Sequence, residues 1–128
     1  MSEAPTGKEL PVINEDALQA IVEMFGDDDP EAIVELLDTF LSESAIQVRT
    51  MQTSLASGDM ESLHRMAHSL KSSSATFGAG RLSSQCAQLE RLAKDGCQGD
   101  CEAVVHQIVA EHDQACIVLR DLRTAYAQ

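Results

Sequence analysis

The sequence is poor in aromatic residues and in proline. Aromatic residues make up 3% of its 128 residues, and tryptophan is absent. The three prolines are Pro5, Pro11 and Pro30, so only glycine interrupts regular structure after residue 30. A core built from Leu, Ile, Val, Met and Ala suits packed helices better than a β-sandwich. The length fits one domain with one modest core.

Basic residues are also scarce. The chain has 9 Lys and Arg against 21 Asp and Glu, for a net charge of −12. This charge excludes nucleic acid and anionic membrane as ligands, because both require a basic face. Between Glu9 and Val48 there is no Lys or Arg, and ten acidic residues occur there. We interpret this stretch as a solvated helix face that aids solubility, although the asymmetry could also orient a partner.

Long apolar runs are missing. No run approaches the roughly 20 residues that span a bilayer, and the N-terminus lacks the apolar core of a signal peptide. We therefore expect a cytoplasmic protein that does not enter a membrane. In that compartment its four cysteines, Cys86, Cys97, Cys101 and Cys116, are expected to be reduced thiols.

The residues that are present divide the chain into helices. Residues 1–13 show little periodicity, and we expect a flexible tail there. Apolar residues then recur at helical spacing over residues 15–25, 30–56, 60–76, 80–94 and 100–125. Start signals precede the first three helices at Asn14, Asp29 and Asp59, and glycines end the first four at Gly26, Gly58, Gly78 and Gly96.

Short links between these helices imply antiparallel neighbours. The expected fold is all-α, an antiparallel up-down four-helix bundle with an additional short N-terminal helix, formed by residues 14–128 as one domain. The residues expected to face its core from the four long helices are Ile33, Leu36, Leu37, Phe40, Leu41, Ser44, Val48, Met51 and Leu55; Leu63, Ala67, Leu70 and Ser74; Leu82, Cys86, Leu89 and Ala93; and Val104, Ile108, Ala115, Leu119 and Leu122.

One face of the helix at 60–76 is nearly free of long side chains around a single imidazole. At 3.6 residues per turn, His64, His68, Lys71, Ser72 and Ala75 share this face, away from the expected core. The run of small residues over 72–75 leaves room for another protein to approach His68. The helix at 80–94 adds a carboxylate, because an antiparallel turn about residue 79 brings Glu90 level with His68.

A carboxylate at that position can accept a hydrogen bond from Nδ1–H of His68 and leave a lone pair on Nε2. A neutral imidazole held in this way is a nucleophile, and the cation of Lys71 could stabilise an incoming phosphoryl group. The segment from Ala67 to Ala79, with Leu89-Glu90 on the next helix, resembles the signature of histidine-containing phosphotransfer (HPt) domains of bacterial multistep phosphorelays. The family pattern is roughly A-H-x-L-K-G-S-x-x-x-G-A followed by L-E or L-Q.

The resemblance implies a phosphocarrier without kinase or nucleotide-binding activity of its own. His68 would be phosphorylated, Lys71 would contact the phosphoryl group, and Glu90 would orient the imidazole. The implied partners are receiver domains of hybrid sensor kinases and response regulators; the receiver supplies Mg²⁺, and the chain itself needs no cofactor. A monomer is the family default. The docking or supporting residues expected around His68 are His64, Ser72, Ala75 and Gly78, with Ser72 standing where the family commonly has glycine.

Two other interpretations of these residues are less consistent with the sequence. A non-catalytic adaptor could use the same face to dock and sequester a receiver or kinase, but the intact His68 and Lys71 favour the carrier. A zinc site is not expected, because the spacing of its candidate ligands fits no common zinc motif and helix geometry spreads them over different faces: Cys97, Cys101, His106 and His112. A stand-alone carrier and a domain excised from a hybrid kinase would share this sequence pattern.

Overall fold

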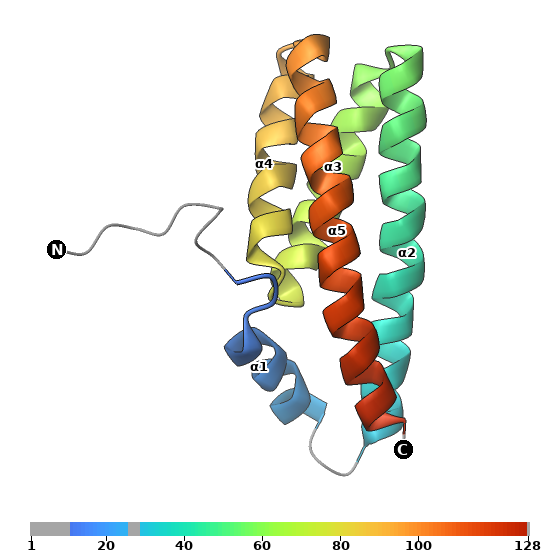
Figure 1. The fold of residues 1–128 in the computed structure, drawn as a ribbon, viewed down its shortest axis with the longest axis vertical. Helices are drawn as coiled ribbons and strands as arrows, with labels where there is room; N and C mark the ends of the chain where they lie inside the picture. The colour runs from blue at the N-terminus through green and yellow to red at the C-terminus, as the bar shows by residue number, and fades with distance from the viewer. Residues whose placement is uncertain (1–10, 26–28, 128) are drawn as a thin grey trace, which may run out of the picture.

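The computed structural model describes residues 11–25 and 29–127, and this part of the chain is all-helical. Its five helices are α1 (Glu15–Phe25), α2 (Pro30–Ser57), α3 (Met60–Thr76), α4 (Gly80–Lys94) and α5 (Gln98–Tyr126), as Figure 1 shows. Their bounds lie within two residues of those expected from the sequence. The largest difference is at α5, which begins at Gln98 rather than near residue 100.

The expected capping residues begin the first three helices. The side chain of Asn14 accepts a hydrogen bond from the backbone N–H of Asp16 at 2.9 Å. Those of Asp29 and Asp59 each accept one at 3.1 Å from the N–H three residues further on. These bonds satisfy backbone donors that have no partner within the helix. Gly26, the expected end of α1, lies outside the described residues.

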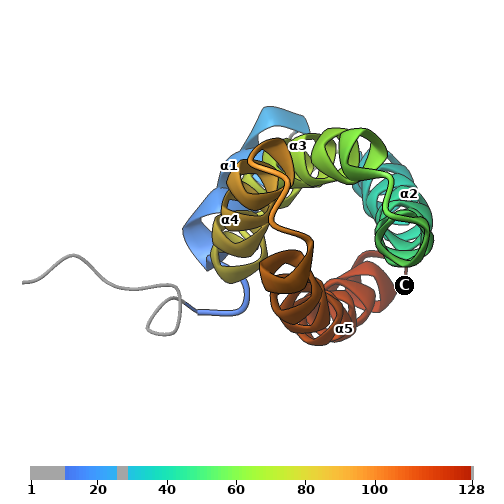
Figure 2. The same cartoon turned by 90° about the horizontal axis from the view of Figure 1, so that it is seen from above.

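The four long helices lie side by side around a common core, seen end-on in Figure 2. Helices α2 and α4 each contact both α3 and α5, which closes the ring of four. The short α1 lies at one end and contacts α2 (Figure 1). Consecutive long helices are joined by two or three residues, so His68 on α3 and Glu90 on α4 lie on adjacent elements.

The core consists largely of the residues expected from helical spacing. Every expected core residue of α3 and α4 is buried, and on α2 only the three leucines Leu36, Leu41 and Leu55 are merely half-buried. Phe40 of α2 packs against Phe77 with a ring centroid distance of 4.7 Å. Helix α5 differs most from the expected pattern of burial. Leu122 is half-buried, and four further residues that were not expected in the core are buried, namely Cys101, Val105, His112 and Cys116.

The turn between α3 and α4 is tied to the N-terminal segment. Gly78 has a positive φ of 78°, the conformation that closes a helix at little cost only for glycine. Its carbonyl accepts a hydrogen bond from Asn14 N–H at 2.7 Å, and a Cβ at this position would lie 2.6 Å from the Asn14 carbonyl oxygen. Gly78 is therefore a buried structural residue, and its expected role at the docking surface is limited to support of the turn.

The expected tail needs one correction. Ile13, which was assigned to it, is only 7% exposed and belongs to the hydrophobic core cluster. The chain is therefore packed against the bundle before α1 begins, because burial of one isoleucine side chain is worth roughly 1.5–3 kcal/mol. Residues 1–10 lie outside the described part. Within the described part, none of the helices combines the length and the apolar character needed to cross a membrane.

Candidate functional site

The site is built on the solvent-facing side of α3. His64, His68 and Lys71 follow one another at i, i+4 and i+7, so their side chains lie on one face of the helix. The side chain of His68 is 60% exposed, and those of His64 and Lys71 are 37% and 34% exposed. The face is thus accessible to another molecule, with the greatest access at His68.

His68 is held by a carboxylate from the neighbouring helix. Its Nδ1 lies 2.6 Å from Oε2 of Glu90 on α4, as expected from the position of both residues about the turn. An ionised carboxylate only accepts hydrogen bonds, so Nδ1 must carry the proton. In the described part of the chain Nε2 has no hydrogen-bond partner, and in the neutral form of the ring it keeps its lone pair. In that form the exposed nitrogen can act as a nucleophile.

Lys71 binds the other oxygen of the same carboxylate. Its Nζ donates a hydrogen bond to Oε1 of Glu90 at 2.6 Å. The hydrogen bond from Lys71, and next that from His68, lower the pKa of Glu90 from its ordinary value. Glu90 therefore stays ionised at neutral pH. The sequence predicted the bond between Glu90 and His68 but not the one between Glu90 and Lys71.

His64 is close to the same carboxylate but is not bonded to it. Its Nε2 lies 3.8 Å from Oε2 of Glu90, the oxygen that accepts the bond from His68. This separation is too long for a hydrogen bond but short enough for a charge interaction. His64 was expected to be a docking residue on the rim, and the structure places it beside the carboxylate that is bonded to His68.

Packing of α4 against α3 fixes the position of Glu90. Leu89 and Ala93 are buried, so Glu90, between them in sequence, lies at the edge of the core with a side chain that is 17% exposed. Ser83 of α4 donates a hydrogen bond to the backbone carbonyl of Lys71 at 2.9 Å, which joins the two helices near the site. The carboxylate is therefore presented by rigid helical backbone rather than by a loop.

Cys86 lies one turn before Glu90, on the buried side of α4. Burial, with a further contribution from the negative charge of Glu90, raises the pKa of its thiol to about 12. The thiol is therefore protonated at neutral pH and is a poor nucleophile. Cys86 is therefore a core residue, whereas the side chain of His68 is exposed.

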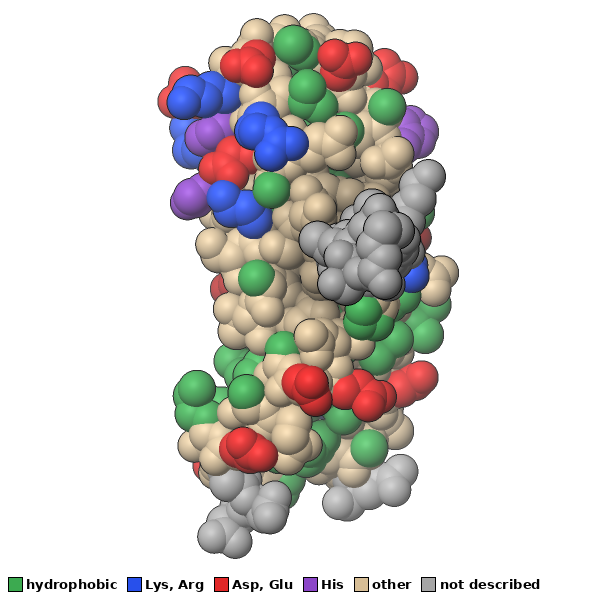
Figure 3. All heavy atoms as spheres, turned by 90° about the vertical axis from the view of Figure 1, so that its left-hand side faces the viewer, with side chains coloured by type: hydrophobic (Ala, Val, Ile, Leu, Met, Phe, Trp, Pro, Cys, Tyr) green, Lys and Arg blue, Asp and Glu red, His purple; other side chains and the backbone are tan. Residues whose placement is uncertain are grey.

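The surface around the site has two parts. Figure 3 shows histidine, basic and acidic side chains gathered at the upper left of the face formed by α3 and α4, above a band that is largely without charge. Ser72 and Ala75, the expected docking residues that follow Lys71 on α3, are both exposed. Arg81, also near this motif in the sequence, instead lies 3.7 Å from Glu111 of α5 and is not part of the cluster.

A second cluster of polar side chains, formed around the single histidine His112, lies inside the bundle. His112 of α5 is 7% exposed, and its Nε2 lies 2.8 Å from Oγ of Ser44 on α2 and 3.3 Å from Sγ of Cys116. Burial lowers the pKa of His112 and raises that of Cys116. One signal in the sequence pointed to this cluster: Ser44 is expected inside, and a buried hydroxyl requires a polar partner.

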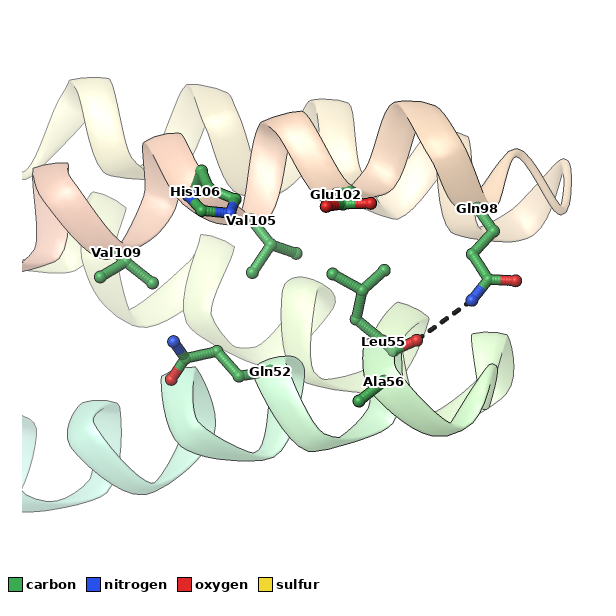
Figure 4. A pocket seen from close by; sticks show the side chains of 8 residues that line it. All are labelled: Gln52, Leu55, Ala56, Gln98, Glu102, Val105, His106 and Val109. Carbon is green, nitrogen blue, oxygen red and sulfur yellow. Dashed lines mark hydrogen bonds between the residues drawn. The ribbon is translucent and has the colours of Figure 1, made fainter.

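The candidate zinc ligands are not brought together. Cys101 is buried, His112 binds Ser44, and His106 lies on a groove of about 580 Å³ between α2 and α5, shown in Figure 4. In this groove Gln98 donates a hydrogen bond to the backbone carbonyl of Leu55 at 3.1 Å. Within the described residues, no three His, Cys, Asp or Glu side chains form a group that could hold a metal ion.

Known proteins show the same arrangement of helices. The family model described as Hpt domain matches residues 35–122, which include His68, Lys71 and Glu90. The chain is similar to a crystal structure of histidine-containing phosphotransfer protein B (HptB) from Pseudomonas aeruginosa PAO1, with a TM-score of 0.83 and 30% sequence identity. That alignment covers 91% of this chain and 97% of the other. A search of curated proteins found no match.

Proposed function

Because this chain belongs to the Hpt domain family, we propose that it is a phosphocarrier whose acceptor atom is Nε2 of His68. It takes a phosphoryl group from an aspartyl phosphate on one receiver domain and passes it to an aspartate on another. The observation that carries this assignment is the bond of 2.6 Å between His68 Nδ1 and Glu90, because in the neutral ring it places the proton on Nδ1 and leaves the lone pair on the exposed Nε2.

The transfer begins with attack of the Nε2 lone pair on phosphorus. The N–P bond forms as the P–O bond to the aspartyl carboxylate breaks, and the aspartate leaves with the electron pair. No proton has to be removed from His68, since Nδ1–H stays bonded to Glu90 throughout. The phosphorylated ring carries positive charge, which the adjacent carboxylate stabilises. Onward transfer is the reverse step, with the aspartate of the second receiver as the nucleophile.

Lys71 provides the cation closest to the reacting group. It lies one turn after His68, and its ammonium can interact with the phosphoryl oxygens as they approach. Phosphoryl transfer depends mainly on in-line positioning and charge neutralisation. The receiver supplies Mg²⁺ and most of the other catalytic groups, so this chain requires no cofactor of its own. Ser72 and Ala75 provide the uncrowded surface on which the receiver docks.

The proposed setting follows from the same assignment. The chain from Ile13 onward acts as one domain, an antiparallel up-down four-helix bundle with α1 as its additional N-terminal helix. The protein works as a monomer in the cytoplasm, between receiver domains of hybrid sensor kinases and of response regulators. It has no kinase activity of its own, because one receiver domain donates the phosphoryl group and another accepts it.

The test is transfer of radioactive phosphate from a phosphorylated receiver. Wild-type protein should acquire an acid-labile, alkali-stable label, and His68→Gln should acquire none. His106→Gln, which changes an exposed histidine on α5, is the matched control and should be labelled like wild type. Normal labelling of His68→Gln would reject the assignment. Tight receiver binding without any label on wild-type protein would instead indicate the non-catalytic adaptor.

A further inference from the structure

In this structure the ammonium group of Lys71 is bonded to Glu90. Its Nζ lies 2.6 Å from Oε1, within a strong charge-assisted hydrogen bond. The proposed function requires the same ammonium to approach a phosphoryl group on Nε2 of His68. The imidazole ring separates these two places, because Nδ1 faces Glu90 and Nε2 faces the phosphorus. Lys71 must therefore loosen its bond to Glu90 when it turns to the phosphoryl group.

Loss of that bond would leave Glu90 poorly compensated. The carboxylate is only 17% exposed, so water cannot fully replace the ammonium. A charged group in such a place is costly unless it keeps its partners. The remaining bond from His68 would then be the only direct one to Glu90, at the moment when the carboxylate must hold the imidazole most firmly.

His64 is placed to supply the missing donor. Its Nε2 is 3.8 Å from Oε2, so a small movement of the ring would bring it within hydrogen-bond distance. Among the interactions given for the described residues, Glu90 is the polar group that faces the His64 ring. Beside it lies an open hollow of about 370 Å³ lined by Met60, Glu61, His64, Ala93 and Lys94, which gives the ring room to move.

We infer that His64 is a positioning residue that binds Glu90 when Lys71 turns to the phosphoryl group. This inference rests on the proposed function and adds a step to it. Two donors would alternate on one carboxylate: Lys71 before transfer and His64 while the phosphoryl group is present. Glu90 thereby keeps two partners in both states, and the orientation of His68 is maintained through the transfer.

The direct test is nitrogen NMR of the histidine rings in the wild-type protein. Phosphorylation by a receiver should shift the Nε2 resonance of His64 to that of a hydrogen-bonded N–H, with His68 Nδ1 still protonated. Lys71→Met should produce the same change at His64 without phosphorylation, because it removes the competing donor. An unchanged His64 ring under both conditions would overturn the inference.

Transfer kinetics supply a second readout. His64→Leu should slow onward transfer to a second receiver about fivefold, the size expected for loss of one hydrogen bond. His64→Gln, whose amide can donate to Glu90, should recover most of the rate, and the matched control His106→Leu should not change it. An onward rate for His64→Leu equal to that of wild type would contradict the inference. Failure of His68 to accept any label is a different result, because it would reject the proposed function itself.

Discussion

His68 and His112 each contact a polar group on a neighbouring helix, yet their surroundings differ in two respects. The ring of His68 is 60% exposed and its partner is the carboxylate of Glu90. His112 is 7% exposed and its nearest partner is the hydroxyl of Ser44. The two hydrogen bonds are of similar length, 2.6 Å and 2.8 Å, so length does not distinguish them.

Under the proposed function, this difference in charge and access explains why His68 rather than His112 would accept a phosphoryl group. Glu90 would then keep the proton on Nδ1 of His68 and offset the positive charge that phosphorylation adds. Ser44 is neutral and can do neither strongly. Burial lowers the pKa of His112 and so keeps its ring neutral, but burial also prevents a receiver from reaching it. We therefore expect His112 to contribute to the stability of the bundle, whereas the proposed function assigns the chemistry to His68.

Among the variants that keep His68, removal of the carboxylate of Glu90 should produce the largest effect on phosphoryl transfer. Glu90→Ala should slow phosphoryl transfer to His68 by about 10–100-fold, the range typical for loss of a group that orients a functional histidine. Glu90→Gln keeps an oxygen for Nδ1–H but no charge, and its rate should fall between those of wild type and Glu90→Ala. Rapid-quench kinetics with a labelled receiver measure this. Equal rates for wild type and Glu90→Ala would remove the proposed difference between the two histidines.

Acidification should weaken the buried cluster first. The pKa of His112 is lowered in the folded state, so the unfolded chain binds its proton more readily. The contribution of neutral His112 to the free energy of unfolding is fully present above the unfolded pKa of about 6.5. It is lost as the pH falls below that value, by at most about 1.4 kcal/mol per pH unit. Glu90, whose pKa is also lowered, keeps its contribution until the pH falls below its unfolded value of about 4.3.

Urea unfolding of wild type and His112→Gln at several values between pH 7 and pH 5 separates these contributions. The glutamine can still bind Ser44 but does not titrate, so the free energy of unfolding should depend less on pH in the variant. Identical pH dependence of the two proteins would show that burial of His112 does not influence its protonation.

The smallest effect is expected from Ser44→Ala. It removes the hydroxyl that lies 2.8 Å from His112, and it should lower the free energy of unfolding by about 1 kcal/mol, the typical worth of one hydrogen bond. Phosphoryl transfer should be unchanged, because Ser44 does not contact the site on α3. Thermal unfolding and the labelling assay measure the two quantities. A slower transfer in this variant would show that the two histidine clusters are coupled.

Much of the fold could be predicted from local signals. Asp29 and Asp59 cap their helices through a hydrogen bond from the backbone N–H three residues further on, and such a local bond can be predicted from the residue type at the start of the helix. The buried faces of α3 and α4 follow from helical spacing alone. Glu90 could be paired with His68 because the turn at Gly78 is short and leaves a single register between the two helices.

The contacts that the sequence did not predict join residues that are distant in the chain, or depend on which of several partners a side chain binds. Burial of His112 results from the approach of Ser44, 68 residues away in the chain. Ile13 precedes the first stretch of helical periodicity, and its burial depends on tertiary packing of a segment that the bond between Asn14 and Gly78 also ties to the bundle. Lys71 could be assigned to a phosphoryl group from its spacing, but its bond to Glu90 depends on the side-chain conformations of both residues.

The central claim is that Nε2 of His68 is the acceptor atom and that Glu90 keeps the proton on Nδ1. Combined phosphorus and nitrogen NMR of the protein after phosphorylation by a receiver tests both parts in one spectrum. The predicted result is a phosphorus–nitrogen coupling at Nε2 of His68 together with a protonated Nδ1. Phosphorus on Nδ1 of His68, or on His64, would contradict the account.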